Sequence, residues 1–240
     1  MVRIIIIICL CFLIISTSTP GQYNDKRFSL SANLNYTTSA RIYLNPNASD
    51  FDLRSKVFSL AKIVSPSIDF RYGITKDIFA GVSVELIEKT DFGDNVIVRN
   101  PNGEFRTIRV EDGFKVIPVE FFVYYLLPFS SSRFKLLMGG GAAYYYGEHI
   151  RKFGNVDVSN LEQEFAYGIQ VNISSDYLIN DFVSVRAEMK FRDPEIDVTS
   201  RYNKNLITYN GQTILITDNE FDSRININGV TFIIGVAFHF

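Results

Sequence analysis

Charged side chains that alternate with apolar ones are the residues of this sequence most able to do chemistry. In the segment from Arg186 to Lys190, every second residue is charged, and an extended strand places such residues on one face. The same alternation elsewhere assigns eight charges to one parity: Asp69, Arg71, Glu85, Glu120, Lys135, Arg186, Glu188 and Lys190. Isolated charges are costly to remove from water, so a set of both signs predicts an interior network of ion pairs. A narrow path for ions or a small solute, with Arg186 and Glu120 as its constriction, would require the same residues.

Other motifs carry weaker chemical signals. The run Gly139 to Gly141 suggests a phosphate-binding loop, but no Lys followed by Ser or Thr comes after it. Glycines in a strand more often allow another backbone to approach closely. The two histidines are His149 and His239, and no serine stands beside His149 to complete a hydrolase site. We therefore expect no enzyme activity, no cofactor and no metal site.

The element that would position these charges is a β-strand with one apolar face. In the last eleven residues, Val230 to Phe240, every second position is apolar, whereas the positions between are smaller and more mixed. A tilted transmembrane strand needs about 9–11 residues, so this segment is long enough to cross a bilayer. Seven further segments alternate in the same way: 28–36, 64–72, 78–86, 117–125, 134–146, 165–173 and 183–191.

The connections between these segments alternate in length. Those near residues 73–77, 127–132 and 179–181 are short, whereas 45–56, 88–113, 147–163 and 192–223 are long and two of them contain hairpin signals, at 96–110 and 206–216. An even number of strands with this alternation is typical of a transmembrane barrel. We therefore predict an all-β fold, an eight-stranded antiparallel up-and-down transmembrane β-barrel, in one domain over residues 22–240. Its least secure strand contains Pro66, which lacks a ladder donor.

The first 21 residues predict a signal peptide. Arg3 precedes an apolar run, Ile4 to Ile15, that is too short for a spanning helix, and small polar residues follow to Gly21. Both cysteines of the chain, Cys9 and Cys11, lie in this segment, so the exported chain would have no disulfide. The chain has 24 basic and 26 acidic residues, which gives no argument for binding nucleic acid.

At the C-terminus, Phe232, Phe238 and Phe240 share one face and the chain ends on the last of them. This pattern resembles the C-terminal sorting strand of bacterial outer-membrane β-barrels, which the barrel-assembly machinery recognises. The whole arrangement resembles small eight-stranded outer-membrane proteins of the OmpX and OmpW kind. The resemblance implies an outer-membrane location, short periplasmic turns, contact with outer-membrane lipid, and a role for these three residues as an assembly signal.

From these observations we expect a monomeric, non-enzymatic outer-membrane barrel with a structural or surface-interaction role through long extracellular loops, whose outer partner the sequence does not identify. The first alternative is a small porin-like channel for ions or apolar solutes. The second is a secreted lipocalin-like binding barrel, which would also alternate but would place its apolar face inside.

Overall fold

The computed structural model describes residues 26–99, 105–154, 156–163, 165–209, 211–216 and 219–240. The predicted signal peptide, residues 1–21, lies outside the described residues. Nearly all of the described chain is strand, with one short helix, α2 (Phe51–Arg54). Among the described residues, no helix is long and apolar enough to cross a membrane.

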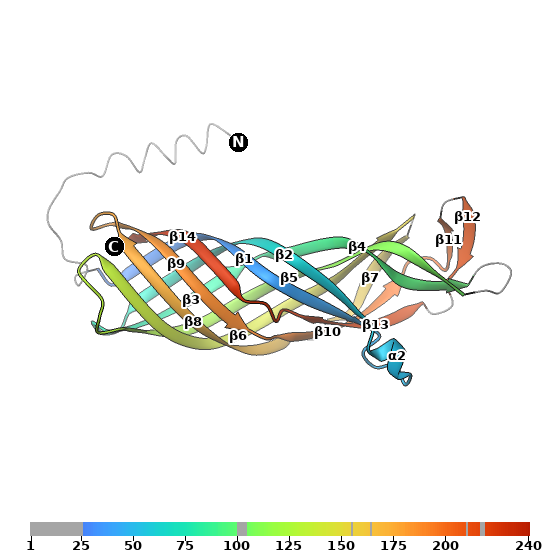
Figure 1. The fold of residues 1–240 in the computed structure, drawn as a ribbon, viewed down its shortest axis with the longest axis horizontal. Coiled ribbons are helices and arrows are strands. Elements are labelled where there is room, and N and C mark those ends of the chain that lie inside the picture. Colours follow the sequence, from blue (N-terminus) through green and yellow to red (C-terminus); the bar gives the residue numbers. More distant parts are fainter. Residues whose placement is uncertain (1–25, 100–104, 155, 164, 210, 217–218) are drawn as a thin grey trace, which may run out of the picture.

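Eight antiparallel strands form a closed ring, which confirms the predicted fold (Figure 1). Adjacent strands pair around the ring, and β14 returns to β1 in a register that runs from Ser29 opposite His239 to Thr37 opposite Thr231. The ring strands are β1 (Phe28–Leu44), β2 (Val57–Gly73), β3 (Ile78–Glu85), β5 (Phe105–Leu126), β6 (Phe134–Phe153), β8 (Ala166–Leu178), β9 (Val183–Arg192) and β14 (Thr231–His239).

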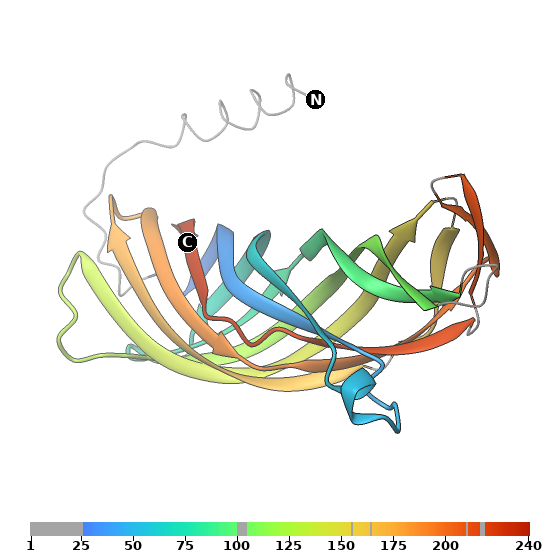
Figure 2. The same ribbon diagram turned by 45° about the vertical axis from the view of Figure 1, so that its right-hand side comes forward.

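Opposite the short turns, further strands prolong the wall; we call this part the extension (Figures 1 and 2). It contains β4 (Ile87–Arg99), β7 (Val156–Gln163), β10 (Glu195–Tyr202), β11 (Leu206–Tyr209), β12 (Gln212–Leu215) and β13 (Glu220–Asn226). In it β4 pairs with β5, β7 with β6 and β10, and β13 with β10 and β1. The predicted hairpins at 96–110 and 206–216 correspond to β4–β5 and β11–β12, whereas the predicted loop at 147–163 is wrong because β6 and β7 continue the wall there.

The outer face of the ring carries an exposed apolar belt. Each ring strand contributes at least one large apolar side chain to it: Leu34, Ile68, Val84, Phe121, Met138, Ile169, Val185 and Ile234. On β5 the outward residues are apolar from Tyr125 to Ile117, and the next outward residue is Lys115. The lipocalin-like alternative is wrong, because a secreted barrel would hide this apolar face inside.

Pro66 lies inside β2, opposite Leu34 of β1, so the least secure strand prediction is confirmed. The Pro66 carbonyl accepts the N–H of Leu86 at 3.1 Å, and regular pairing of β2 with β3 begins at the next residue, Ser67 opposite Glu85. The missing proline donor therefore falls where the β2–β3 ladder ends, a position at which proline costs little.

Candidate functional site

The interior of the ring contains two layers of ion pairs. The lower charged layer, nearer the short turns, is centred on Arg186 and Arg71. Arg186 donates from Nε and Nη2 to the two oxygens of Asp176, at 2.8 and 2.9 Å, and from Nη1 to Asp69 at 2.5 Å. Arg71 donates to Asp69 at 2.9 Å and to Glu188 at 2.7 Å. All five side chains are buried, so two guanidinium groups and three carboxylates form one buried network.

The upper charged layer lies farther from the short turns and joins Lys190 and Arg192 to Glu85 and Glu120. Arg192 donates from Nη1 to Glu85 at 2.7 Å and to Glu120 at 3.0 Å, and Lys190 also pairs with Glu120. The hydroxyl of Ser65 donates to the other oxygen of Glu85 at 2.5 Å. Two cations and two carboxylates thus form a second buried network.

A constriction made by Arg186 and Glu120 is wrong, because the two side chains do not meet. Arg186 stands directly opposite Asp176 in the β8–β9 register, whereas Glu120 pairs with Lys190, four residues farther along β9. Four strand residues span about 13 Å, so the two side chains belong to different layers. Glu188, two residues from Arg186 on the same face of β9, pairs with Arg71.

Seven of the eight predicted interior charges lie in these layers. Lys135 is half-buried at the short-turn end of β6, opposite Asp176 in the β6–β8 register, so it lies at the edge of the lower charged layer. The prediction missed Asp176 and Arg192. Asp176 follows Ser174 by two residues and Arg192 follows Lys190 by two, so continuing the alternation one step further would have found both.

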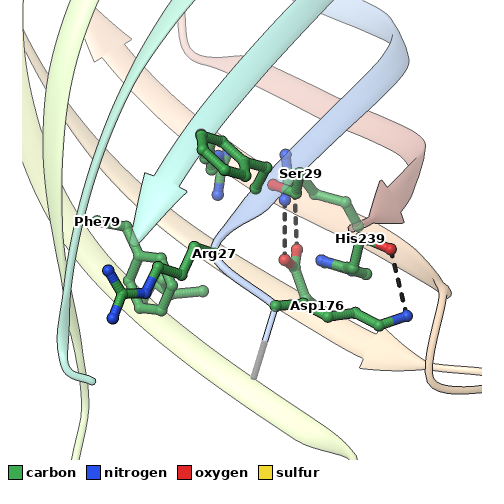
Figure 3. A pocket seen from close by; sticks show the side chains of 10 residues that line it. Arg27, Ser29, Phe79, Asp176 and His239 are labelled. Atoms are coloured by element: carbon green, nitrogen blue, oxygen red, sulfur yellow. Dashed lines mark hydrogen bonds and ion pairs between the residues drawn. The ribbon is translucent and has the colours of Figure 1, made fainter. Parts of the chain in front are cut away.

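The short-turn end of the barrel has a small pocket below the lower charged layer (Figure 3). Asp176 points into it from β8, and Arg27, Phe79 and His239 surround it. The His239 ring lies 2.8 Å from the hydroxyl of Ser184 (Nε2 to Oγ). This pocket at the short-turn end is therefore lined mainly by polar and charged groups.

Aromatic side chains pack beside the lower charged layer. The Arg71 guanidinium lies 4.4 Å from the ring centroid of Tyr124 and 5.5 Å from that of Phe122.

A Cβ on Gly141 would come 1.8 Å from the carbonyl oxygen of Phe121, and one on Gly139 would come 2.1 Å from that of Val123. These contacts confirm that the glycine run allows close approach of β5 and β6.

Above the upper charged layer the interior becomes apolar. The middle core contains buried side chains from both the ring strands and the extension, including Ile42, Ile63, Ile87, Phe114, Val116, Tyr145, Ile196 and Ile225. A second apolar group, the tip core, lies at the far end of the extension and includes Val98, Ile108, Val110, Tyr202 and Ile214. The extension is thus packed like the interior of a soluble protein.

A polar cluster in the extension joins β4, β5 and β6 to the β10–β13 wall. Asp112 accepts two bonds from Arg151, both at 2.8 Å, and one from the Asn95 amide at 2.8 Å, and His149 Nε2 lies 2.9 Å from it. Arg151 also donates to the Tyr202 hydroxyl at 2.9 Å. The sequence prediction placed all of these residues in loops and therefore missed the cluster.

The titration of this cluster follows from its burial, beyond the apolar belt. Burial alone would raise the pKa of Asp112, but the charge of Arg151 and the hydrogen bond from His149 hold that pKa well below its usual range. Burial lowers the pKa of His149, and the adjacent Asp112 only partly opposes this effect. At neutral pH, Asp112 is therefore charged and His149 is neutral.

The sequence matches a known protein family. The profile of the OmpW family matches residues 37–240. The chain belongs to the OmpW family. A comparison with curated protein sequences finds no match.

Several solved structures are similar to this chain at low sequence identity, and the similarity to OprG supports the fold. OprG from Pseudomonas aeruginosa has a TM-score of 0.57 and 12% identity, and the alignment covers 90% of this chain and 96% of OprG. Outer membrane protein W of E. coli has a TM-score of 0.41 and 16% identity, over 90% of this chain and 98% of that protein. Ail of Yersinia pestis has a TM-score of 0.43 and 10% identity, over 90% and 99%. This OmpW-family chain is accordingly a bacterial outer-membrane protein.

The predicted assembly residues of this OmpW-family barrel lie on the closing strand. Phe232 and Phe240 are exposed on the outer face, and Phe238 is half-buried there. Phe240 exchanges two backbone hydrogen bonds with Phe28, at 2.9 and 3.0 Å, and the two rings stack with centroids 5.9 Å apart. Phe240 therefore contributes to closing the ring, and its role in assembly stays a prediction.

The OmpW-family chain offers no metal-binding group within the described ranges: no three His, Cys, Asp or Glu side chains are placed to hold an ion there. His149, the histidine considered for a hydrolase, is fully buried between the two apolar cores, and its close partner is Asp112.

Proposed function

We propose that this OmpW-family protein is a non-enzymatic outer-membrane barrel that acts at the cell surface through its extension, with the short turns in the periplasm. The observation that supports this most is the filling of the barrel interior. From the short turns outward, the chain places two charged layers, the middle core, the polar cluster and the tip core in sequence. An eight-stranded barrel has an interior just wide enough for such filling.

This filling argues against ion passage along the barrel axis. An ion would first have to displace ion pairs whose partners are almost completely buried, such as Arg192 with Glu85 and Glu120. It would then enter the middle core, whose mainly apolar side chains compensate little of the loss of its hydration shell. We therefore prefer the surface role to an ion channel.

The extension is suited to a surface role because it is rigid rather than loop-like. Its wall is hydrogen-bonded through β4, β7, β10 and β13, and its interior is packed. The β11–β12 hairpin prolongs the sheet at its tip through the pairing of Leu215 with Arg99 of β4. Such a platform holds binding side chains in fixed positions, which lowers the entropic cost of recognition.

One observation favours a second function, the passage of a small apolar solute. The middle core lies directly above the upper charged layer, close to the height at which the apolar belt ends. An apolar molecule that displaced these side chains would meet the ion pairs below. Because it cannot replace the partners of these buried charges, it would leave sideways into the lipid. The solute would then never cross the charged layers.

Two measurements test the proposed function. In planar bilayers, the purified protein should show no steady ion conductance, and protease added to whole cells should cleave the hairpin near Gly211 but not the turn near Lys76. Stable conductance, or a hairpin protected in cells without a capsule, would overturn the surface role. For the second function, an apolar fluorescent dye should enter cells faster when the protein is present, and Ile63→Glu should abolish the difference; Ile68→Thr, on the outer face, is the matched control.

A further inference from the structure

The outer wall of the extension contains a groove that the proposed function leaves unused. It has a volume of about 420 Å³, and Phe92, Arg109, Glu111, Lys152 and Tyr209 line it. Ligand pockets have volumes of about 300–1,000 Å³, so this groove has room for one or two sugar units. Arg109 and Glu111 alternate with the buried Val110 and Asp112, so the groove opens sideways rather than into the barrel.

The groove lies beyond the apolar belt. On the outer face of β4, the polar residues Glu88 and Thr90 separate Phe92 from Leu86 of the belt. On β5, Glu111 lies four residues before Lys115, the polar outward residue next to the belt, which places it about 13 Å farther from the belt along the strand. Phe92 nevertheless leaves 59% of its surface exposed. This exposed ring forms one side of the groove.

The side chains in the groove combine two aromatic rings with charges of both signs. Phe92, Glu111 and Lys152 stand in one row across β4, β5 and β6. Tyr209 reaches the groove from the β11–β12 hairpin, and its hydroxyl donates to the Arg109 carbonyl at 3.2 Å, which fixes the ring. The groove therefore has a fixed aromatic ring, Tyr209, at its edge and charged side chains at its base.

This chemistry fits a sugar that carries an acidic group. Aromatic rings pack against the C–H faces of a sugar, and a carboxylate such as Glu111 accepts hydrogen bonds from its hydroxyl groups. Arg109 and Lys152 would bind a phosphate or carboxylate by charge-assisted hydrogen bonds. Arg109 can do so with two parallel N–H groups.

We propose that the groove binds a phosphorylated sugar in the core of outer-membrane lipopolysaccharide. The inference rests on the orientation and surface role proposed above. The sideways opening, a short distance above the belt, faces the head groups of neighbouring outer-leaflet lipids rather than the medium. Two cations against one carboxylate give the groove a net positive charge, which complements the sugar phosphates. The lipid-linked sugar is also confined beside the wall, so its effective concentration there is high.

The test measures binding of the purified full-length barrel, in detergent, to lipopolysaccharide with a truncated core. The double variant Arg109→Gln/Lys152→Gln should weaken binding about ten-fold or more, since it removes two charge-assisted contacts. Arg41→Gln/Arg54→Gln removes two exposed cations elsewhere on the extension and should change binding less than about two-fold. Dephosphorylated lipopolysaccharide should bind the unaltered protein as weakly as intact lipopolysaccharide binds the groove variant.

Unboiled gels establish that each variant is folded before binding is measured, and Tyr209→Ala, which leaves all charges in place, provides a second groove variant. Equal binding by the unaltered protein and both groove variants would overturn the proposal. So would groove-dependent binding of a soluble anionic polysaccharide, such as heparin, without binding of lipopolysaccharide. None of these outcomes alters conductance or hairpin cleavage, so failure of the groove is distinguishable from failure of the surface role.

Discussion

Replacing Arg186 by Met should reveal how the lower charged layer is held. Methionine keeps an unbranched apolar chain, shorter than that of arginine by the end of the guanidinium group, and removes all of the N–H donors. Asp176 would lose both of its hydrogen bonds to Arg186 and would stay buried without them. Asp69 would lose one bond but would keep Arg71 and Ser31 as donors.

The expected loss of stability follows from this difference between Asp176 and Asp69. Removing one partner of a buried ion pair typically costs about 3–5 kcal/mol, because the other charge remains without compensation. We expect a loss in this range for Arg186→Met, with most of it arising at Asp176. Adding Asp176→Asn removes the stranded charge, so the double variant should recover part of the loss, with a coupling energy of about 1–3 kcal/mol.

Glu120→Gln is the matched control, because Glu120 belongs to the upper charged layer and makes no contact with Arg186 in the described network. Combined with Arg186→Met, it should give losses that add within about 0.5 kcal/mol.

The assay is urea unfolding of the barrel in lipid vesicles, followed by far-ultraviolet circular dichroism and by the unboiled gel band. A loss below about 1 kcal/mol for Arg186→Met would refute the claim that this layer depends on charge pairing. Coupling of Arg186 to Glu120, with none to Asp176, would refute the assignment of the two layers.

Three further predictions concern other parts of the chain. Because folding lowers the pKa of both His149 and Asp112, the extension should be most stable above pH 6.5 and should lose stability as the pH falls through 6.5, and again below 3.8. Limited proteolysis between pH 8 and pH 3 measures this loss of stability. An unchanged pH profile for His149→Gln would contradict the assignment of the loss near pH 6.5 to His149. Gly141→Ala should destabilise the barrel by about 1–3 kcal/mol because its Cβ would strike the β5 backbone, whereas Gly73→Ala, whose nearest contact is 3.5 Å, should unfold in urea like the unaltered protein. Deleting Phe240 should reduce the amount of protein assembled in the outer membrane many-fold. It should lower the melting temperature of the folded fraction only modestly, since the deletion removes two hydrogen bonds and one exposed ring. Normal amounts of the deletion variant in outer-membrane fractions would argue against an assembly signal.

Strand parity was the part of this structure that could be predicted from sequence. Alternation alone assigned Asp69, Arg71, Glu85 and Glu120 to the interior, and all four are buried there. The same pattern predicted the ring of eight strands and its closure between the first and last. These features depend on local geometry, because successive side chains of a strand point to opposite faces.

Pairing partners could not be predicted in the same way. Which charges meet across a barrel depends on strand tilt and stagger, and these are properties of the whole ring. Arg71 and Glu188 lie 117 residues apart in sequence and meet inside the lower charged layer. The neighbouring pair Asp176 and Arg186, joined by a tight turn, could have been inferred from a longer sixth strand.

The extension was missed for a different physical reason. Each predicted strand ended where its outward face became polar, which marks the end of contact with lipid and not the end of the strand. Beyond Lys115, β5 continues with Phe114 and Val110 directed inward, so the apolar side of the strand changes from outside to inside. A single alternation template centred on an outward apolar face cannot follow that change.

This inversion explains how one set of strands stabilises two different structures. Within the belt, lipid surrounds the apolar outer face, so the interior must be filled by polar groups, and charge pairing satisfies them. In the extension, water surrounds the wall, so stability must come from an apolar interior, which the middle and tip cores provide. The polar cluster of Asp112, His149 and Arg151 is the exception within that interior, and burial between two apolar cores makes each of its hydrogen bonds costly to leave unmade. The cluster connects the β4–β5–β6 wall to the β10–β13 wall through the hydrogen bond from Arg151 to Tyr202, so the two walls of the extension cannot separate without breaking it. The ring needs no such connection, because its ladder closes on itself between β14 and β1.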